Sequence, residues 1–265
     1  MADAQRNESE LLFEEYLRTH GYGEWTYEIP VEGKRRTPDY RFEHSGTSNF
    51  FEVKEFDATL PLPGVSSYDP YPPIREKINQ VTRQFKEYKE FPCLVVLANP
   101  KSAFVRLGDW WAIYGAMLGN LGFTVPLGVA ADKKHPIKNV FLGGGKMIDE
   151  KRRKPQNTTV SSVIVLGTYP LWQNQIRVAI KQRERELGRT TTFDEALAFY
   201  EAMPETPDQR RVRVSVYENP YARISLNRDL FNGPFDQRWG LDGVDIKRLY
   251  LGPEAARFEE ALGES

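Results

Sequence analysis

The sequence predicts an α/β fold with the element order helix, three strands, helix, strand in residues 7–99. Apolar side chains recur at helical spacing in residues 7–20 and 74–91, which predicts two amphipathic helices. Two alternating segments flank a polar turn in residues 37–56, as is typical of a β-hairpin. The continuously apolar run at 93–99 predicts a buried strand.

Composition narrows the class of protein. Of the 265 residues, 40% are hydrophobic, which is enough for a sizeable core. The single cysteine, Cys93, excludes a disulfide framework and a cysteine-based zinc cluster, and the three histidines show no ligand spacing. The net charge of −1 excludes a uniformly basic coat protein for nucleic acid. Without an apolar leader or a membrane-length apolar run, we expect a cytoplasmic protein with no membrane partner.

The first helix is expected over residues 7–20, ended by Gly21. A helical projection places Glu10 and Glu15 at the borders of its apolar face and points Glu14 away from it. The apolar face is expected to contain Leu11, Leu12, Phe13, Tyr16 and Leu17.

A first strand over residues 25–31 and a hairpin of strands 37–43 and 50–56 follow, with the turn at residues 44–49. Because strand side chains alternate, two opposite charges fall between two phenylalanines on one face: Phe50, Glu52, Lys54 and Phe56. Charges are seldom buried without partners, so this face is expected to open into a polar site. An ordinary solvent-facing hairpin with a Glu–Lys pair is the alternative.

Pro38-Asp39, followed thirteen residues later by Glu52-Val53-Lys54, resembles the motif of the PD-(D/E)XK phosphodiesterase superfamily. The resemblance implies a restriction-endonuclease-like αβββαβ core, with a mixed central sheet flanked by helices. It implies that Asp39, Glu52 and the Val53 carbonyl hold Mg²⁺ or Mn²⁺, for which oxygen ligands are suited. Lys54 is then expected to position the attacking water or to neutralise charge in the transition state.

Two helices extend the resemblance. The stretch ELLFEEYLRTHGY resembles the glutamate-bearing first helix of Mrr-like restriction enzymes, which favours Glu10 and then Glu15 as a supporting catalytic carboxylate. In the helix over 74–91, Gln84 four residues before Tyr88 resembles a motif of RecB-like members that helps hold the metal site. Gln80 is an alternative. The alternative for the first helix is that its glutamates are solvated residues on the rim of the helix. The alternative for the second helix is that its glutamines have no role in a site.

Basic residues near the motif are expected to bind nucleic acid, with a solvated turn or loop as the alternative in each case. The predicted contacts to the polynucleotide backbone are Lys34, Arg35, Arg36, Lys151, Arg152, Arg153 and Lys154. Gly145-Lys146-Met147 lacks the hydroxyl residue of a phosphate-binding P-loop, which argues against nucleotide binding as the main function.

Residues 1–100 are predicted to form the core, and residues 101–265 a C-terminal α/β extension packed on it or part of one continuous domain. This extension is expected to contain helices at 109–121 and 172–187 and after Thr192, strands at 123–129, 159–168 and 247–251, an edge strand at 211–218, and an acidic tail.

The expected function is that of a metal-dependent endonuclease or exonuclease acting on DNA. Restriction, phage defence or repair is the biological setting that the resemblance implies, with a homodimer or a defence-system protein as partner. A catalytically inactive nucleic-acid-binding module on the same fold and an RNA-directed nuclease are the alternatives.

Overall fold

The computed structural model describes residues 6–28, 30–56, 69–101, 105, 107–124, 138–149, 154–203, 211–243 and 245–264. The N-terminal part contains α1 (Glu8–Thr19), β1 (Trp25–Tyr27), β2 (Tyr40–His44), β3 (Thr47–Glu55), α2 (Tyr71–Gln84), the 3-10 helix η1 (Phe85–Glu87) and β4 (Cys93–Ala98). Next come α3 (Trp110–Leu118), β5 (Asn120–Thr124), β6 (Lys138–Leu142), β7 (Ile148–Asp149), β8 (Lys154–Pro155) and β9 (Val160–Tyr169). The chain continues with α4 (Leu171–Leu187), α5 (Phe193–Ala202), β10 (Arg211–Glu218), β11 (Gln237–Asp242), β12 (Asp245–Leu251) and α6 (Pro253–Leu262).

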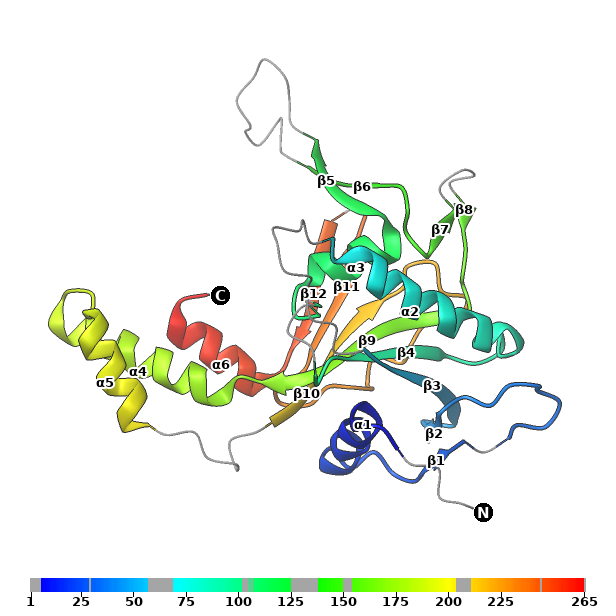
Figure 1. Ribbon diagram of the computed structural model, residues 1–265, viewed down its shortest axis with the longest axis horizontal. Coiled ribbons are helices and arrows are strands. Elements are labelled where there is room, and N and C mark those ends of the chain that lie inside the picture. Colours follow the sequence, from blue (N-terminus) through cyan, green and yellow to red (C-terminus); the bar gives the residue numbers. More distant parts are fainter. Residues whose placement is uncertain are drawn as a thin grey trace, which may run out of the picture.

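The described elements form a mixed α/β structure around one eight-stranded sheet with the order β1-β2-β3-β4-β9-β10-β11-β12. Strands β3, β4 and β9 are parallel, whereas β1-β2-β3 and β9-β10 are antiparallel. Helices α2 and α3 cover one face and α1 covers the other (Figure 1). The predicted order of helix, three strands, helix and strand in residues 7–99 is confirmed.

The hairpin of β2 and β3 has a tighter turn than the six residues predicted. Ser45 and Gly46 both adopt positive φ angles, 50° and 74°, and they alone connect the two strands. Two consecutive residues with positive φ are the geometry of a two-residue hairpin turn, which matches the twist of the flanking strands. Strand β2 begins only at Tyr40, so Asp39 lies just before it, and Tyr40 pairs with Phe51.

The alternation predicted for β3 is confirmed. Phe50 and Phe56 belong to the apolar cluster that α2 and α3 share with the sheet, whereas Phe51 and Val53 belong to the cluster on the side of α1. Glu52 lies between the phenylalanines of the first cluster and is fully buried. A buried charge therefore faces α2, as the strand period requires.

The sheet continues beyond residue 100 without a break. Buried β4 lies between two parallel neighbours, β3 and β9, so both parts of the chain contribute strands to one sheet. The prediction of an edge strand at 211–218 was wrong, because β11 pairs in parallel with β10 and β12 continues the sheet. Neither β11 nor α6 was predicted. Gly240 lies within β11, and the Asn, Pro and Gly residues that precede the strand are typical of loops.

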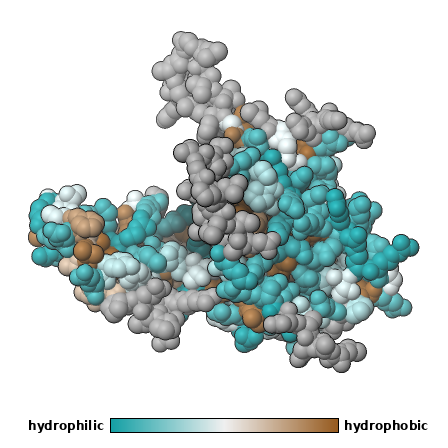
Figure 2. All heavy atoms as spheres, in the orientation of Figure 1, coloured by the Kyte–Doolittle hydropathy of each residue, from teal (hydrophilic) through white to brown (hydrophobic). Residues whose placement is uncertain are grey.

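Helices α4 and α5 form an arm that projects away from the sheet, at the left of Figure 1. Helix α5 begins with the predicted capping box of Thr192 and Glu195, and none of its residues is buried. Phe193 is 80% exposed, and apolar residues are visible on this arm in Figure 2. In the part of the chain that the structure describes, no helix combines the length and the apolar character needed to cross a membrane.

Candidate active site

Asp39 and Glu52 lie on opposing segments of the hairpin. The Val53 backbone N–H donates a 2.7 Å hydrogen bond to Asp39 Oδ2, which fixes the Asp39 side chain against β3. Burial raises the pKa of Asp39 to about 7, and the nearby charge of Glu52 adds to the rise while Lys54 opposes it. Two carboxyl groups are therefore held close enough to repel each other, and either a proton or a cation would relieve this repulsion.

Lys54 provides one positive charge at this place. Its Nζ atom donates a 2.6 Å hydrogen bond to Glu52 Oε1, and the Glu52 side chain is only 1% exposed. Within the part of the chain that the structure describes, the second oxygen, Glu52 Oε2, is buried without a hydrogen-bond partner. Burial raises the pKa of Glu52, although the charge and hydrogen bond of Lys54 act in the opposite direction. We call Asp39, Glu52 and Lys54 the candidate site.

Helix α2 and the turn after it cover the candidate site. Gln84 is the last residue of α2, and a hydrogen bond from its side chain to Glu52 lowers the pKa of that carboxyl. Among the described residues, Gln84 Oε1 is buried without a hydrogen-bond partner. Tyr88 lies beyond α2, after η1, and its hydroxyl donates a 2.5 Å hydrogen bond to the Arg36 carbonyl. The alternative residue, Gln80, is exposed and bonds to Glu76 at 3.2 Å, so Gln84 is the glutamine near the site.

Glu10 does not have a free carboxylate. It forms the capping box of α1, in which Glu10 Oε2 accepts the Asn7 backbone N–H at 2.7 Å. Its other oxygen accepts the Tyr27 hydroxyl at 3.2 Å. The Glu10 charge nevertheless contributes to raising the pKa of Asp39. Glu10 therefore lies near the site, but the end of the helix and a tyrosine already occupy its oxygens.

The helical projection of α1 was wrong at two positions. Glu14 is buried and accepts a 3.1 Å hydrogen bond from the Tyr40 hydroxyl, because β1 and β2 present polar groups to this side of the helix. Leu11, predicted on the apolar face, is 53% exposed. Glu15 is half-buried and, within the described chain, has no hydrogen-bond partner. Helical periodicity does not distinguish an apolar neighbour from a polar one, which explains both errors.

The predicted basic contacts differ in how accessible they are. Lys34 is not free for a phosphate, because its Nζ atom donates to the Glu87 carbonyl and pairs with Glu90. Arg35 and Arg36 are exposed, and their guanidinium groups have no hydrogen-bond partner among the described residues. Lys154 is exposed in β8. Lys151, Arg152 and Arg153 lie outside the described residues.

Metal-ligating side chains are few. No group of three or more His, Cys, Asp or Glu residues that could hold a metal ion exists within the described ranges. At the candidate site the side-chain donors are the two carboxylates of Asp39 and Glu52. A cation there needs further ligands from backbone carbonyls, such as that of Val53, or from water.

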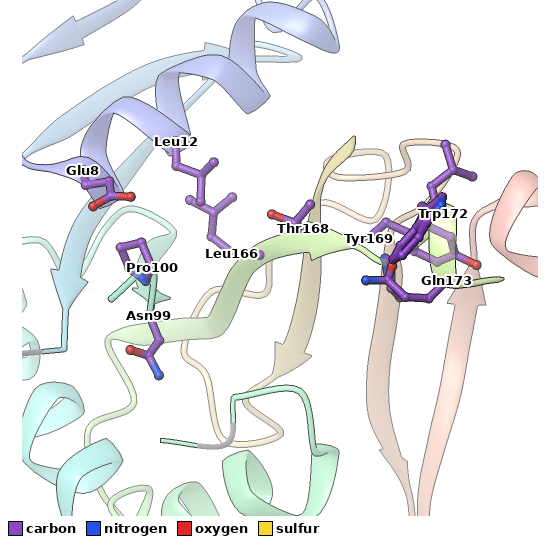
Figure 3. Close-up of a pocket in the computed structure, with 12 residues that line it drawn as sticks. Glu8, Leu12, Asn99, Pro100, Leu166, Thr168, Tyr169, Trp172 and Gln173 are labelled. Atoms are coloured by element: carbon purple, nitrogen blue, oxygen red, sulfur yellow. The ribbon is translucent and has the colours of Figure 1, made fainter. Parts of the chain in front are cut away.

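Cavity size does not point to the candidate site. A cavity of about 530 Å³ lies between α1 and the start of α4, lined among others by Glu8, Asn99, Thr168 and Gln173 (Figure 3). None of the residues of the candidate site lines it. We therefore locate the site by its charges and not by its volume.

Glu55 is a polar residue near the motif for which the sequence suggested no role. Its carboxylate accepts the backbone N–H and the hydroxyl of Ser9, at 3.1 and 2.9 Å, and pairs with Lys101 at 2.5 Å. Glu55 lies three residues after Glu52 in β3, so its side chain points to the opposite face of the sheet. On that face it contacts α1 and stabilises the first turn of the helix. The alternation of side chains in the sequence predicted the face on which Glu55 lies, but it could not predict the contact with Ser9.

Comparisons with family models, curated proteins and solved structures found no match for this chain.

Proposed function

We propose that this chain is a metal-dependent nuclease with the restriction-endonuclease-like fold, hydrolysing phosphodiester bonds with DNA as the expected substrate. The observation that carries the proposal is the meeting of Asp39, Glu52 and Lys54 on one hairpin, with Gln84 over them. The element order of residues 8–98 supports it, because it agrees with the αβββαβ order of the PD-(D/E)XK core.

The donors at the candidate site fit a hard divalent cation. Glu52 Oε2 is a buried oxygen without a hydrogen-bond partner among the described residues, and Asp39 uses Oδ2 for its bond to the Val53 N–H. Mg²⁺ or Mn²⁺ would be held by these two carboxylates and the Val53 carbonyl. The chemistry supplied there is polarisation of a phosphoryl oxygen and a lower pKa for a coordinated water.

The side chains around this place have separate tasks in the proposal. Lys54, whose side chain is 23% exposed, stabilises negative charge on the phosphoryl oxygens and orients the attacking water. The Val53 N–H holds the Asp39 carboxylate in position. Gln84 restrains Glu52, and Tyr88 restrains the segment before Asp39 through the Arg36 carbonyl. Rigid support of this kind keeps reacting groups in the productive geometry.

A second candidate is a catalytically inactive module that binds nucleic acid. The observation favouring it is that the candidate site has two side-chain carboxylates and no larger group of metal-ligating side chains in the described chain. Exposed Arg35 and Arg36, just before Asp39, would then serve binding alone.

Cleavage assays separate the two candidates. Supercoiled DNA and single-stranded RNA are incubated with the wild-type protein in Mg²⁺, Mn²⁺ or EDTA. Glu52→Gln is the test variant, and Glu43→Gln is the matched control, because Glu43 is an exposed carboxylate on the same hairpin. The nuclease proposal requires metal-dependent cleavage by wild type and Glu43→Gln and its loss in Glu52→Gln.

Metal binding is measured in the same proteins by the shift in melting temperature on adding Mn²⁺. The shift is expected for wild type and Glu43→Gln and should be absent in Glu52→Gln. Binding of nucleic acid without cleavage under every metal condition would favour the inactive module.

A further inference from the structure

Arg213 lies in β10 and lines a cavity of about 490 Å³, together with Thr168 and Ser215. The Ser215 hydroxyl oxygen accepts a 2.8 Å hydrogen bond from Gln237 Nε2, and the same hydroxyl lies close enough to the Tyr217 hydroxyl to lower the pKa of that group. Asp109 also lines the cavity and has an interaction partner of its own. The cavity therefore presents the Arg213 guanidinium group to a ligand.

Among the residues that the structure describes, the guanidinium group of Arg213 has no anionic partner. It is half-buried and lies 5.2 Å from the centre of the Tyr169 ring, but no carboxylate in the described chain is within ion-pair distance. Burial lowers the pKa of Arg213. An arginine withdrawn from water is normally paired with a carboxylate or another anion, since burying its charge alone is costly.

The backbone opposite Arg213 leaves room for a ligand. Arg213 pairs with Gly167 of β9. A Cβ atom built on Gly167 meets no other atom within 4 Å, so the sheet surface beside the guanidinium is open. A glycine at such a place allows a ligand to approach the sheet closely.

Arg213 lies on the same face of the sheet as the candidate site. The register aligns Lys54 with Leu97, Leu97 with Val165, and Val165 with Ser215. Arg213 shares the face of Ser215, two residues away. Three strand spacings of about 4.8 Å separate β3 from β10, or about 14 Å. Successive phosphates of one DNA strand advance about 3.4 Å along the duplex axis, so this distance spans a few nucleotides.

We propose that Arg213 binds a backbone phosphate of the polynucleotide, a few nucleotides from the bond held at Asp39 and Glu52. This inference rests on the proposed function. The planar guanidinium group donates two parallel hydrogen bonds to phosphate oxygens. The contact carries no base specificity and fixes the register of the strand on the sheet.

Binding in EDTA, where no cleavage occurs, tests the proposal. Anisotropy of a fluorescently labelled DNA duplex is measured over a series of salt concentrations for wild type, Arg213→Met and Arg213→Lys. Arg183→Met is the control: the same charge is removed from the exposed arm at α4, far from the sheet face. We expect Arg213→Met to weaken binding about tenfold and to reduce the salt slope by about one. Arg213→Lys should retain the slope and lose part of the affinity.

The melting temperatures of the same variants test whether Arg213 only stabilises the fold. Because no carboxylate of the described residues pairs with the Arg213 guanidinium, Arg213→Met should melt at or above the wild-type temperature. A lower melting temperature with unchanged affinity would show that Arg213 serves the fold, and would overturn the inference. Equal weakening by Arg183→Met would also overturn it.

The control arms separate this inference from the proposed function. If wild type binds DNA and Arg213→Met binds it equally well, only the Arg213 contact is refuted. If wild type binds neither DNA nor RNA even at low salt, the proposed function fails and the Arg213 contact fails with it.

Discussion

The Val53 backbone N–H donates a 2.7 Å hydrogen bond to Asp39 Oδ2. Asp39 precedes β2 and Val53 lies within β3, so this one bond joins the two halves of the motif. The same hydrogen bond orients the Asp39 carboxyl group, because Oδ2 accepts the Val53 backbone N–H. The other oxygen is then presented in a constant direction, which a ligand of a cation requires.

Asp39→Asn is expected to abolish metal-dependent cleavage while leaving the fold intact. The asparagine amide oxygen can still accept the Val53 N–H, whereas the negative charge for the cation is lost. We expect activity to fall by at least about a hundredfold, the upper end of the effect of losing an outer-shell metal partner. The measurement is plasmid cleavage in Mg²⁺, with circular dichroism as the control for folding. Wild-type activity in this variant would refute the assignment of Asp39.

Lys54→Met is expected to destabilise the protein through Glu52. Removing one member of a buried ion pair leaves an uncompensated charge, which costs about 3 kcal/mol. The effect should be largely reversed in the double variant Glu52→Gln/Lys54→Met, because neither charge remains. Urea unfolding of wild type, both single variants and the double variant measures the coupling. Additive effects would show that the 2.6 Å contact contributes no stability.

Tyr16→Phe tests a contact between the two ends of the chain. The Tyr16 hydroxyl in α1 donates to buried Asp236, which also accepts backbone N–H groups of Val214 and Gly233. Removing a hydrogen bond to a charged group costs about 1.5 kcal/mol.

The pH dependence of this contact has a definite sign. Burial raises the pKa of Asp236, while Tyr16 and the two backbone donors, together with the charge of His20, oppose the rise. A raised carboxyl pKa stabilises the fold fully below the ordinary carboxyl pKa, and this contribution is lost as pH rises through the raised value. Tyr16 opposes this rise, which means that its hydrogen bond favours the charged form of Asp236. The cost of Tyr16→Phe should therefore grow as rising pH ionises Asp236 and should shrink in acid. Urea unfolding of wild type and Tyr16→Phe from acid to neutral pH measures the cost of the substitution. A cost that does not change with pH would contradict the prediction.

A fragment of residues 1–100 is expected not to fold by itself. In the full chain, Leu94 and Val96 of β4 pack against Ile164 of β9 and Val214 of β10. Ending the chain at residue 100 would expose this apolar strand as an unpaired sheet edge, which promotes aggregation. Thermal unfolding followed by circular dichroism should show no cooperative transition. A cooperative transition would establish residues 1–100 as an independent domain.

The sequence by itself determined the local features of the site. The alternation of β3 placed Glu52 and Lys54 on one face and Glu55 on the other, because strand side chains alternate strictly. Helical spacing and a glycine also predicted α1 to within one residue at each end. These features follow from the backbone geometry of a few neighbouring residues, so a short stretch of sequence is sufficient to predict them.

Only the tertiary structure decided which partners these residues meet. The sequence could not show that Lys34 pairs with Glu90, that Glu10 caps α1, or that Arg213 lies over the Tyr169 ring. It also placed β10 at an edge, because no local pattern reveals that a later strand will pair beside it. Such contacts join residues far apart in the chain. They depend on how whole elements pack, which is a property of the complete fold.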